Sequence, residues 1–158
     1  MNLVERIKQI EEIQKKRREN NKLLSYNTGE KKHLKQIAFH ECLKKNRWVF
    51  GGNRSGKTEC GAVEVVYFAR GNHPYREIKG ATSGWVVSLS TQVQRDVAQS
   101  KILNYLNPEW IEDVVMLSGR KDSYKNGVID YILVKNVASN LNLKLVLMKR
   151  MPTWTKFM

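Results

Sequence analysis

The stretch "FGGNRSGKTE", Phe50 to Glu59, decides the fold prediction. It matches the phosphate-binding pattern G-x-x-x-x-G-K-[ST] at every fixed position. The residues of the pattern are Gly51, Gly52, Asn53, Arg54, Ser55, Gly56, Lys57 and Thr58. Glycines let the backbone turn tightly, so that successive N–H groups point inward around a phosphate. Lys57 then reaches the β and γ phosphates, and the Thr58 hydroxyl completes the octahedral shell of Mg²⁺.

The flanks of this loop match the arrangement that the pattern requires. The apolar run Trp48-Val49-Phe50 is rich in β-forming residues and predicts a short strand. Residues from Thr58 to Ala69 predict a buried helix, with Gly71 as its C-cap. A chance glycine turn is the alternative interpretation. The strand–loop–helix order favours phosphate binding.

Three further residues are candidates for nucleotide contacts. Arg54, inside the loop, either contacts the γ phosphate or points outward to pair with a surface carboxylate. The Gln36 amide can read the edge of adenine, and Tyr26 can stack on the ring. A glutamine on a helix surface is also commonplace without any ligand.

The rest of the chain predicts an α/β fold with alternating helices and strands. Helices are expected over residues 1–21, 31–45 and 92–106, with a short one near Pro108 that includes Trp110 and Ile111. Strands are expected at 84–89 and 128–134, and Leu141 to Met148 forms a fourth candidate before an end that frays. This order predicts a three-layer domain with a mostly parallel sheet.

Composition and charge say less about the function than the loop does. The chain has 158 residues and a formal net charge of +13, which favours a polyanionic partner such as nucleic acid over the alternative of a well-solvated basic surface. No secretory signal and no apolar run of membrane-spanning length are visible. Cys42 and Cys60 fit no disulfide framework and are interpreted as reduced thiols of a cytosolic protein.

The loop and its flanks resemble one known family. "GGNRSGKT" resembles the Walker A loop of phage terminase large subunits, the ATPases that package viral genomes. "KKHLKQIAFHECLKKNRWVFGGNRSGKT" is similar to that family's adenine-contacting segment leading into the loop. "GNHPYREIKGATSGWVVSLSTQVQRDVAQSKILNYL" is similar to the following connection and strand–helix pair. The resemblance extends from about Tyr26 to Asn136. Its specificity comes from the three segments together and not from any single motif.

The resemblance implies a RecA-like P-loop ATPase domain that uses ATP and Mg²⁺ in the host cytoplasm. It implies double-stranded DNA as the moved substrate, and a small terminase subunit and a portal protein as partners of a homo-oligomeric ring without membrane contact. By match to the family's motif, Gln36 contacts adenine, and Lys57 and Thr58 hold phosphate and metal. Arg54 corresponds to the loop arginine that couples hydrolysis to movement.

The family's second acidic motif, an apolar strand ending in Asp-Glu, has no counterpart here. Asp130 is followed by Tyr131 and is interpreted as a turn or strand-edge residue, and the strand Leu143 to Met148 ends in Lys149-Arg150. The family's nuclease carboxylates are missing as well. We therefore expect an N-terminal helix at 1–25, a partial ATPase domain at 26–137 and an atypical basic tail at 138–158, with a frameshift after Val137 as one hypothesis. The alternatives are a nucleotide-binding fragment without hydrolysis and a P-loop kinase.

Overall fold

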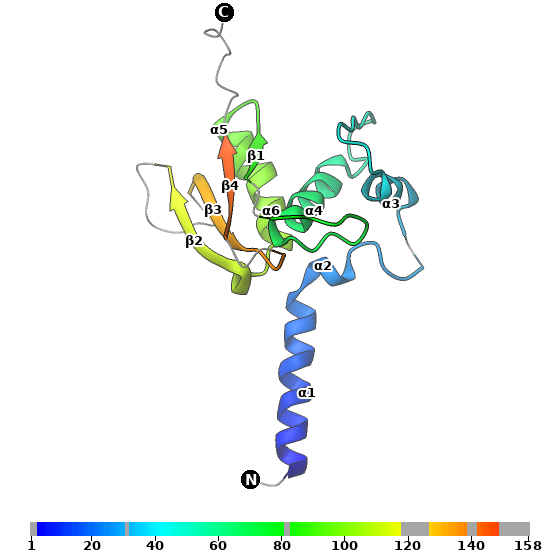
Figure 1. Cartoon of the computed structure of the whole chain (residues 1–158), viewed down its shortest axis with the longest axis vertical. Helices are drawn as coiled ribbons and strands as arrows, with labels where there is room; N and C mark the ends of the chain where they lie inside the picture. Colours follow the sequence, from blue (N-terminus) through cyan, green and yellow to red (C-terminus); the bar gives the residue numbers. More distant parts are fainter. Residues whose placement is uncertain (1–2, 31, 81–82, 118–126, 139–141, 149–158) are drawn as a thin grey trace, which may run out of the picture.

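The computed structural model describes residues 3–30, 32–80, 83–117, 127–138 and 142–148. The larger helices are α1 (Leu3–Asn20), α3 (Leu34–Glu41), α4 (Lys57–Arg70) and α6 (Ser100–Tyr105). The short ones are α2 (Lys22–Ser25), α5 (Thr91–Val93), the π-helix η1 (Gln94–Gln99) and the 3₁₀ helix η2 (Pro108–Trp110). The strands are β1 (Gly84–Val87), β2 (Ile111–Met116), β3 (Ile129–Lys135) and β4 (Asn142–Met148). The chain is therefore an α/β protein, as the sequence predicts (Figure 1).

The four described strands form one mixed sheet in the order β1-β4-β3-β2. β1 pairs with β4 in parallel, whereas β4 pairs with β3, and β3 with β2, in antiparallel fashion. The prediction of a mostly parallel sheet is wrong for these strands, because sequence periodicity does not record strand direction. β4 confirms the fourth strand candidate and lies inside the sheet. The end beyond it, 149–158, which we expected to fray, lies outside the described residues.

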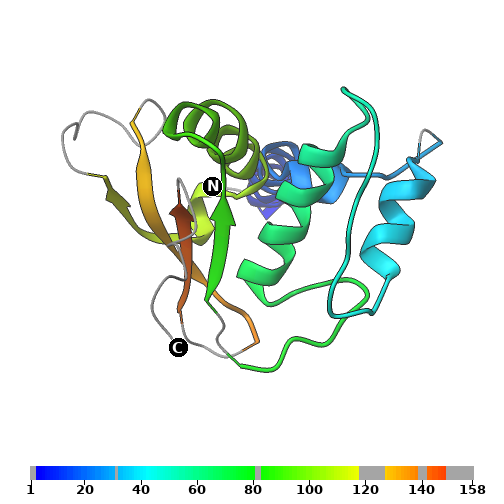
Figure 2. The same cartoon turned by 90° about the horizontal axis from the view of Figure 1, so that it is seen from above.

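The sheet and two helices share one hydrophobic core. α5, η1 and α6 run on without a break from residue 91 to 105, and this helix packs with α4 against one face of the sheet (Figure 2). The buried Gln99 amide fixes the helix to the start of β3, because its Nε2 donates to Gly127 O at 2.9 Å and its Oε1 accepts from Ile129 N at 3.1 Å. The core side chains are Ala62, Val66, Ala69, Ile102, Leu106, Ile129, Ile132, Val134, Leu145 and Leu147.

α4 is the central helix of the domain. It lies between the sheet and α3 (Figure 2). Gly71 ends it in the left-handed conformation at φ 67°, where its N–H donates to Phe68 O and the next N–H donates to Tyr67 O. This confirms the predicted C-cap. The helix starts at Lys57, so the glycine loop leads directly into the helix with the most buried residues among those that the structure describes.

The predicted strand Trp48-Val49-Phe50 does not form. The relative exposures of the three residues are 81%, 47% and 90%, and within the described residues β1 pairs only with β4. Arg47, the preceding residue, donates to Phe39 O at 2.9 Å and pairs with Glu64. These bonds hold the segment beside α3 and α4. A run of three apolar residues is too short to specify its own place in a sheet.

Two other elements differ from their prediction. β2 begins at Ile111, which we assigned to the short helix now seen as η2, and its polar residues hid the strand. α1 confirms the predicted N-terminal helix and projects from the body of the domain (Figure 1), with Val4, Ile7, Ile10 and Ile13 about half exposed. Among the described helices, none combines the length and apolar character needed to cross a bilayer.

Candidate phosphate-binding site

The glycine loop ends in a helix start that leaves donors available. Gly56 takes the left-handed conformation at φ 79° and is the N-cap of α4, with no side chain bonded to the cap. The first backbone hydrogen bond of the helix runs from the N–H of Cys60 to Gly56 O at 3.0 Å. The N–H groups of the first turn, from Lys57 to Glu59, are therefore free of a side-chain cap, and the helix dipole places partial positive charge there. This geometry suits an anion.

The Lys57 ammonium is folded back onto the loop. Its Nζ donates to Gly51 O at 2.7 Å, to Gly52 O at 2.6 Å and to Ser55 Oγ at 3.2 Å. These three bonds use all the donors that a lysine has. Since the side chain is bonded to nothing else that the structure describes, a phosphate that offers stronger acceptors can replace the loop oxygens.

A cavity of about 290 Å³ opens beside the loop. It brings together most of the predicted loop residues with Gln36, the candidate base contact, and a second lysine, Lys35. At this volume the cavity lies near the lower end of small-molecule sites, which typically span about 300 to 1,000 Å³. Its lining residues are His33, Lys35, Gln36, Phe39, Val49, Phe50, Gly51, Gly52, Ser55, Gly56, Lys57 and Cys60.

Gln36 is held with a fixed orientation. Its Nε2 donates to Gly56 O at 3.1 Å, and its Oε1 accepts from the Tyr26 hydroxyl and from Asn27 Nδ2, both at 3.0 Å. A carbonyl only accepts, so the bond to Gly56 fixes which end of the amide carries the N–H groups. Both lone pairs of Oε1 are used, and one N–H of Nε2 remains for a ligand. Gln36 thus presents a donor to the cavity.

Tyr26 lies next to Gln36 but not on the cavity wall. Its ring makes edge-to-face contacts with His40 at 5.6 Å and with Tyr105 at 5.7 Å between centroids. The rings among the described residues that line the cavity are those of His33, Phe39 and Phe50. The stacking role of Tyr26 stays a prediction, and the structure adds a second role for it as a partner of Gln36.

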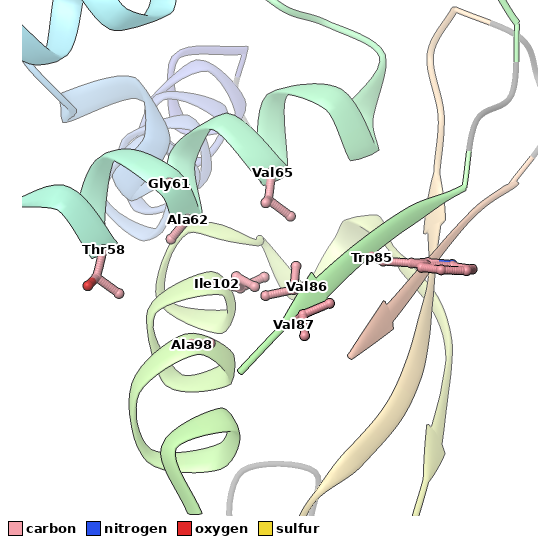
Figure 3. Close-up of a pocket in the computed structure, with 9 residues that line it drawn as sticks. All are labelled: Thr58, Gly61, Ala62, Val65, Trp85, Val86, Val87, Ala98 and Ile102. Atoms are coloured by element: carbon pink, nitrogen blue, oxygen red, sulfur yellow. The ribbon is translucent and has the colours of Figure 1, made fainter. Parts of the chain in front are cut away.

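Thr58, the predicted magnesium ligand, borders a different cavity of about 310 Å³. Figure 3 shows Ala62, Val65, Val86 and Ile102 gathered between α4, β1 and the 91–105 helix, with Thr58 at the start of α4. None of the described residues lining this cavity carries a carboxylate. The described lining of this cavity therefore supplies no counterpart of the missing acidic motif.

The acid next to Thr58 along the chain is engaged elsewhere. Glu59, next to Thr58, accepts from Lys101 Nζ at 2.7 Å and from the Tyr105 hydroxyl. Burial acts to raise the pKa of Glu59, but the bonds to Lys101 and Tyr105 outweigh it, and the pKa is lowered. Asp130 is the second residue of β3, where the sequence had suggested a turn or a strand edge.

Arg54 adopts a left-handed backbone conformation, with φ 60°, at the exposed tip of the loop. No hydrogen bond or ion pair joins it to any of the described residues. The outward pairing with a surface carboxylate that we left open is thus not seen within them, and the guanidinium is available to a ligand. Asn53 lies at the same exposed tip.

Behind the cavity lies a buried cluster that the sequence analysis missed. Glu64 of α4 accepts from His40 Nδ1 at 2.6 Å and from His73 Nε2 at 3.1 Å through one oxygen, and its other oxygen pairs with Arg47. Burial acts to raise the pKa of Glu64, but the bonds from His40, His73 and Arg47 outweigh it and hold the pKa well below its usual range. A glutamate inside the apolar run of α4 was the available signal, because buried carboxylates are paired.

His40, Glu64 and His73 have the residue types and the proximity of a metal site, with donor atoms within 4.8 Å of one another. Their hydrogen bonds argue for an ion-pair cluster instead. His73 Nδ1 accepts from Tyr75 N at 3.1 Å, so its Nε2 carries the proton that faces Glu64. The guanidinium of Arg47 pairs with the other carboxylate oxygen of Glu64. A cation bound here would have to replace the protons through which both histidines bond Glu64.

No family model, no curated protein and no solved structure matches this chain. A functional assignment therefore rests on the residues and geometry given above.

Proposed function

We propose that this chain binds ATP through the loop from Gly51 to Thr58, as the ATP-binding part of a phage terminase large subunit with a RecA-like P-loop fold. The observation that carries the proposal is the joint placement of the loop, the Lys57 ammonium and the Gln36 amide around one cavity at the start of α4. In this scheme the ammonium moves from the loop carbonyls to the β and γ phosphates. The uncapped first turn of α4 receives the same anion.

In the proposed site, different residues contact the base and the phosphates of the nucleotide. Gln36 offers one N–H to a ring nitrogen of the base, and Phe39 and Phe50 supply apolar surface. In this proposal the guanidinium of Arg54, at the exposed loop tip, contacts the γ phosphate. Mg²⁺ would be held by Thr58 and the phosphates, and it would neutralise charge on them. Both lysines of the cavity add attraction for a polyphosphate.

The proposed partners follow from the resemblance and from charge. Double-stranded DNA fits the net charge of +13. A small terminase subunit, a portal protein and a homo-oligomeric ring in the host cytoplasm belong to the same proposal. The exposed apolar side of α1 offers a surface for one of these contacts.

A second candidate is nucleotide binding without hydrolysis. The specific observation that favours it is the cavity beside Thr58, whose described lining holds no carboxylate to support Mg²⁺ or activate water. Glu59 is tied to Lys101 and Tyr105. The two candidates share the binding step and differ only in turnover.

One experiment tests both. Mg-ATP binding to the chain is measured by calorimetry, and phosphate release is measured with and without double-stranded DNA, for the wild type and Lys57→Ala. We expect Lys57→Ala to weaken ATP binding at least about tenfold, because it removes a charged hydrogen-bond donor. We expect little phosphate release from either protein.

The matched control is Lys79→Ala, which removes an exposed lysine paired with Glu77 at 3.7 Å. Equal ATP affinities in Lys57→Ala and Lys79→Ala would refute binding at this loop. Rapid phosphate release that Lys57→Ala abolishes would instead show that an acid outside the described cavity completes the site.

A further inference from the structure

A continuous chain of hydrogen bonds links the buried cluster to the glycine loop. His40 Nδ1 meets Glu64 Oε2 at 2.6 Å, and His40 Nε2 meets the Tyr26 hydroxyl at 3.1 Å. The Tyr26 hydroxyl meets Gln36 Oε1 at 3.0 Å, and Gln36 Nε2 meets Gly56 O at 3.1 Å. The loop backbone is therefore connected, through two side chains, to a histidine that is 2% exposed.

Which group donates in each of these hydrogen bonds follows from the acceptors at the two ends of the series, Gly56 O and the Glu64 carboxylate. Gly56 O only accepts, so Gln36 presents its N–H to the loop and its Oε1 to Tyr26. Tyr26 has one proton, which it donates to Gln36, and its oxygen must then accept from His40. Glu64 is an acceptor as well. Both ring nitrogens of His40 must carry a proton for every bond to be made.

We propose that doubly protonated His40 is the positioning residue for the base side of the site, because it keeps the Tyr26 hydroxyl pointed at Gln36. This inference rests on the proposed nucleotide binding and adds its regulation. When His40 loses the Nε2 proton, that nitrogen becomes an acceptor. It then competes for the only proton of Tyr26, 3.1 Å away, which is a stronger donor than the Cys60 thiol at 3.6 Å. Gln36 Oε1 then loses a donor, and its amide is held less firmly where it meets the base.

The surroundings of His40 favour the protonated form at neutral pH. Burial acts to lower the pKa of His40, but the hydrogen bonds to Cys60 and Glu64 outweigh it and raise the pKa to about 9. Arg47 and His73 share the carboxylate of Glu64 with His40, and the His73 ring also lies 6.5 Å from the His40 ring between centroids. The titratable groups that face the His40 ring are Glu64, Cys60 and Tyr67 from α4, Tyr26 after α2, and His73 after α4.

The first arm of the test is the pH profile of ATP binding in the full chain, from pH 7 to pH 10. For the wild type we expect affinity to fall about fivefold through pH 9, the effect of one hydrogen bond. Tyr26→Phe lacks the hydroxyl, so its affinity should already be about fivefold lower at pH 7 and show no further fall near pH 9. A fall of equal size in Tyr26→Phe would overturn the proposal.

The second arm uses His40→Asn, whose amide stands near the Nδ1 position and can still donate to Glu64. It places no acceptor against Tyr26 and nothing that titrates near pH 9. We expect the ATP affinity of His40→Asn to show no fall through pH 9, so that its ratio to the wild-type affinity rises between pH 7 and pH 10. A merely structural role for His40 predicts a constant ratio of the two affinities at every pH, and that result would contradict the inference. If His40→Asn does not fold, the Tyr26→Phe profile decides alone.

The third arm separates this inference from the proposed function. Inorganic tripolyphosphate has no base, so its affinity should be the same in wild type, Tyr26→Phe and His40→Asn at each pH. If neither ATP nor tripolyphosphate binds the wild type, the proposed function fails and the inference falls with it. If both ligands bind and the three proteins share one ATP profile, only the inference is refuted.

Discussion

The two sides of the candidate site are built in opposite ways. The loop side is exposed, and the Lys57 ammonium is satisfied by oxygens of its own loop. The inner side is buried, and Glu64 gathers partners from α3, from the segment before the loop and from the turn after α4. The loop thus supplies groups that a ligand can rearrange, whereas the cluster supplies the fixed frame. Three predictions test this division.

The largest expected effect is on stability. Glu64→Ala leaves the buried His40 and His73 and the largely buried Arg47 without their carboxylate, and removing one partner of a buried pair costs about 3 to 5 kcal/mol. Urea unfolding followed by circular dichroism measures the change. The control is Glu77→Ala, whose carboxylate is exposed and pairs with exposed Lys79, and which should cost at most about 1 kcal/mol. Similar losses in the two variants would show that the cluster is not the frame.

The cluster shows what the sequence alone does not reveal. The loop could be predicted because its chemistry depends on spacing within eight residues. The cluster joins positions 40, 47, 64 and 73, and no local pattern connects them. Glu64 within the apolar face of α4 indicates that some partner exists, yet only the packing of α3 on α4 identifies it as His40.

The same distinction explains the errors in the fold prediction. α4 and the 91–105 helix were predicted correctly because helical periodicity and caps are local. The strand predicted at residues 48–50 failed because Arg47 binds Phe39 O and Glu64, a contact that the β-propensity of three residues cannot anticipate. β4 was found from its apolar run, but its parallel pairing with β1 and antiparallel pairing with β3 follow from topology.

A second prediction concerns the pH dependence of folding. The pKa of His40 is about 9 in the folded protein and about 6.5 in an unfolded chain, so the folded state binds the proton more tightly. The stabilisation is complete below pH 6.5 and is lost as pH rises through 9, with a total of at most about 3 kcal/mol. Urea unfolding between pH 6 and pH 10 measures this loss. A wild-type slope that His40→Asn retains would assign the titration to another group.

The smallest expected effect is that of a substitution at Gly56, where the glycine loop meets Gln36. Gly56 has φ 79°, and an added Cβ would lie 2.6 Å from Gln36 Nε2. Gly56→Ala should therefore cost about 1 to 2 kcal/mol of stability through backbone strain and should also displace Gln36 from the loop. ATP should bind more weakly, while tripolyphosphate binding should change less.

Gly52→Ala is the matched control within the same loop. Gly52 has no atom within 4 Å of an added Cβ and no positive φ, so this substitution should change unfolding free energy by less than about 0.5 kcal/mol. Comparing the two variants by urea unfolding and calorimetry isolates the contact between the loop and the buried frame. If both alanines change the unfolding free energy and the ATP affinity alike, the shape of the loop does not depend on Gln36. Gly56 would then belong to the loop that a ligand can rearrange, and not to the fixed frame.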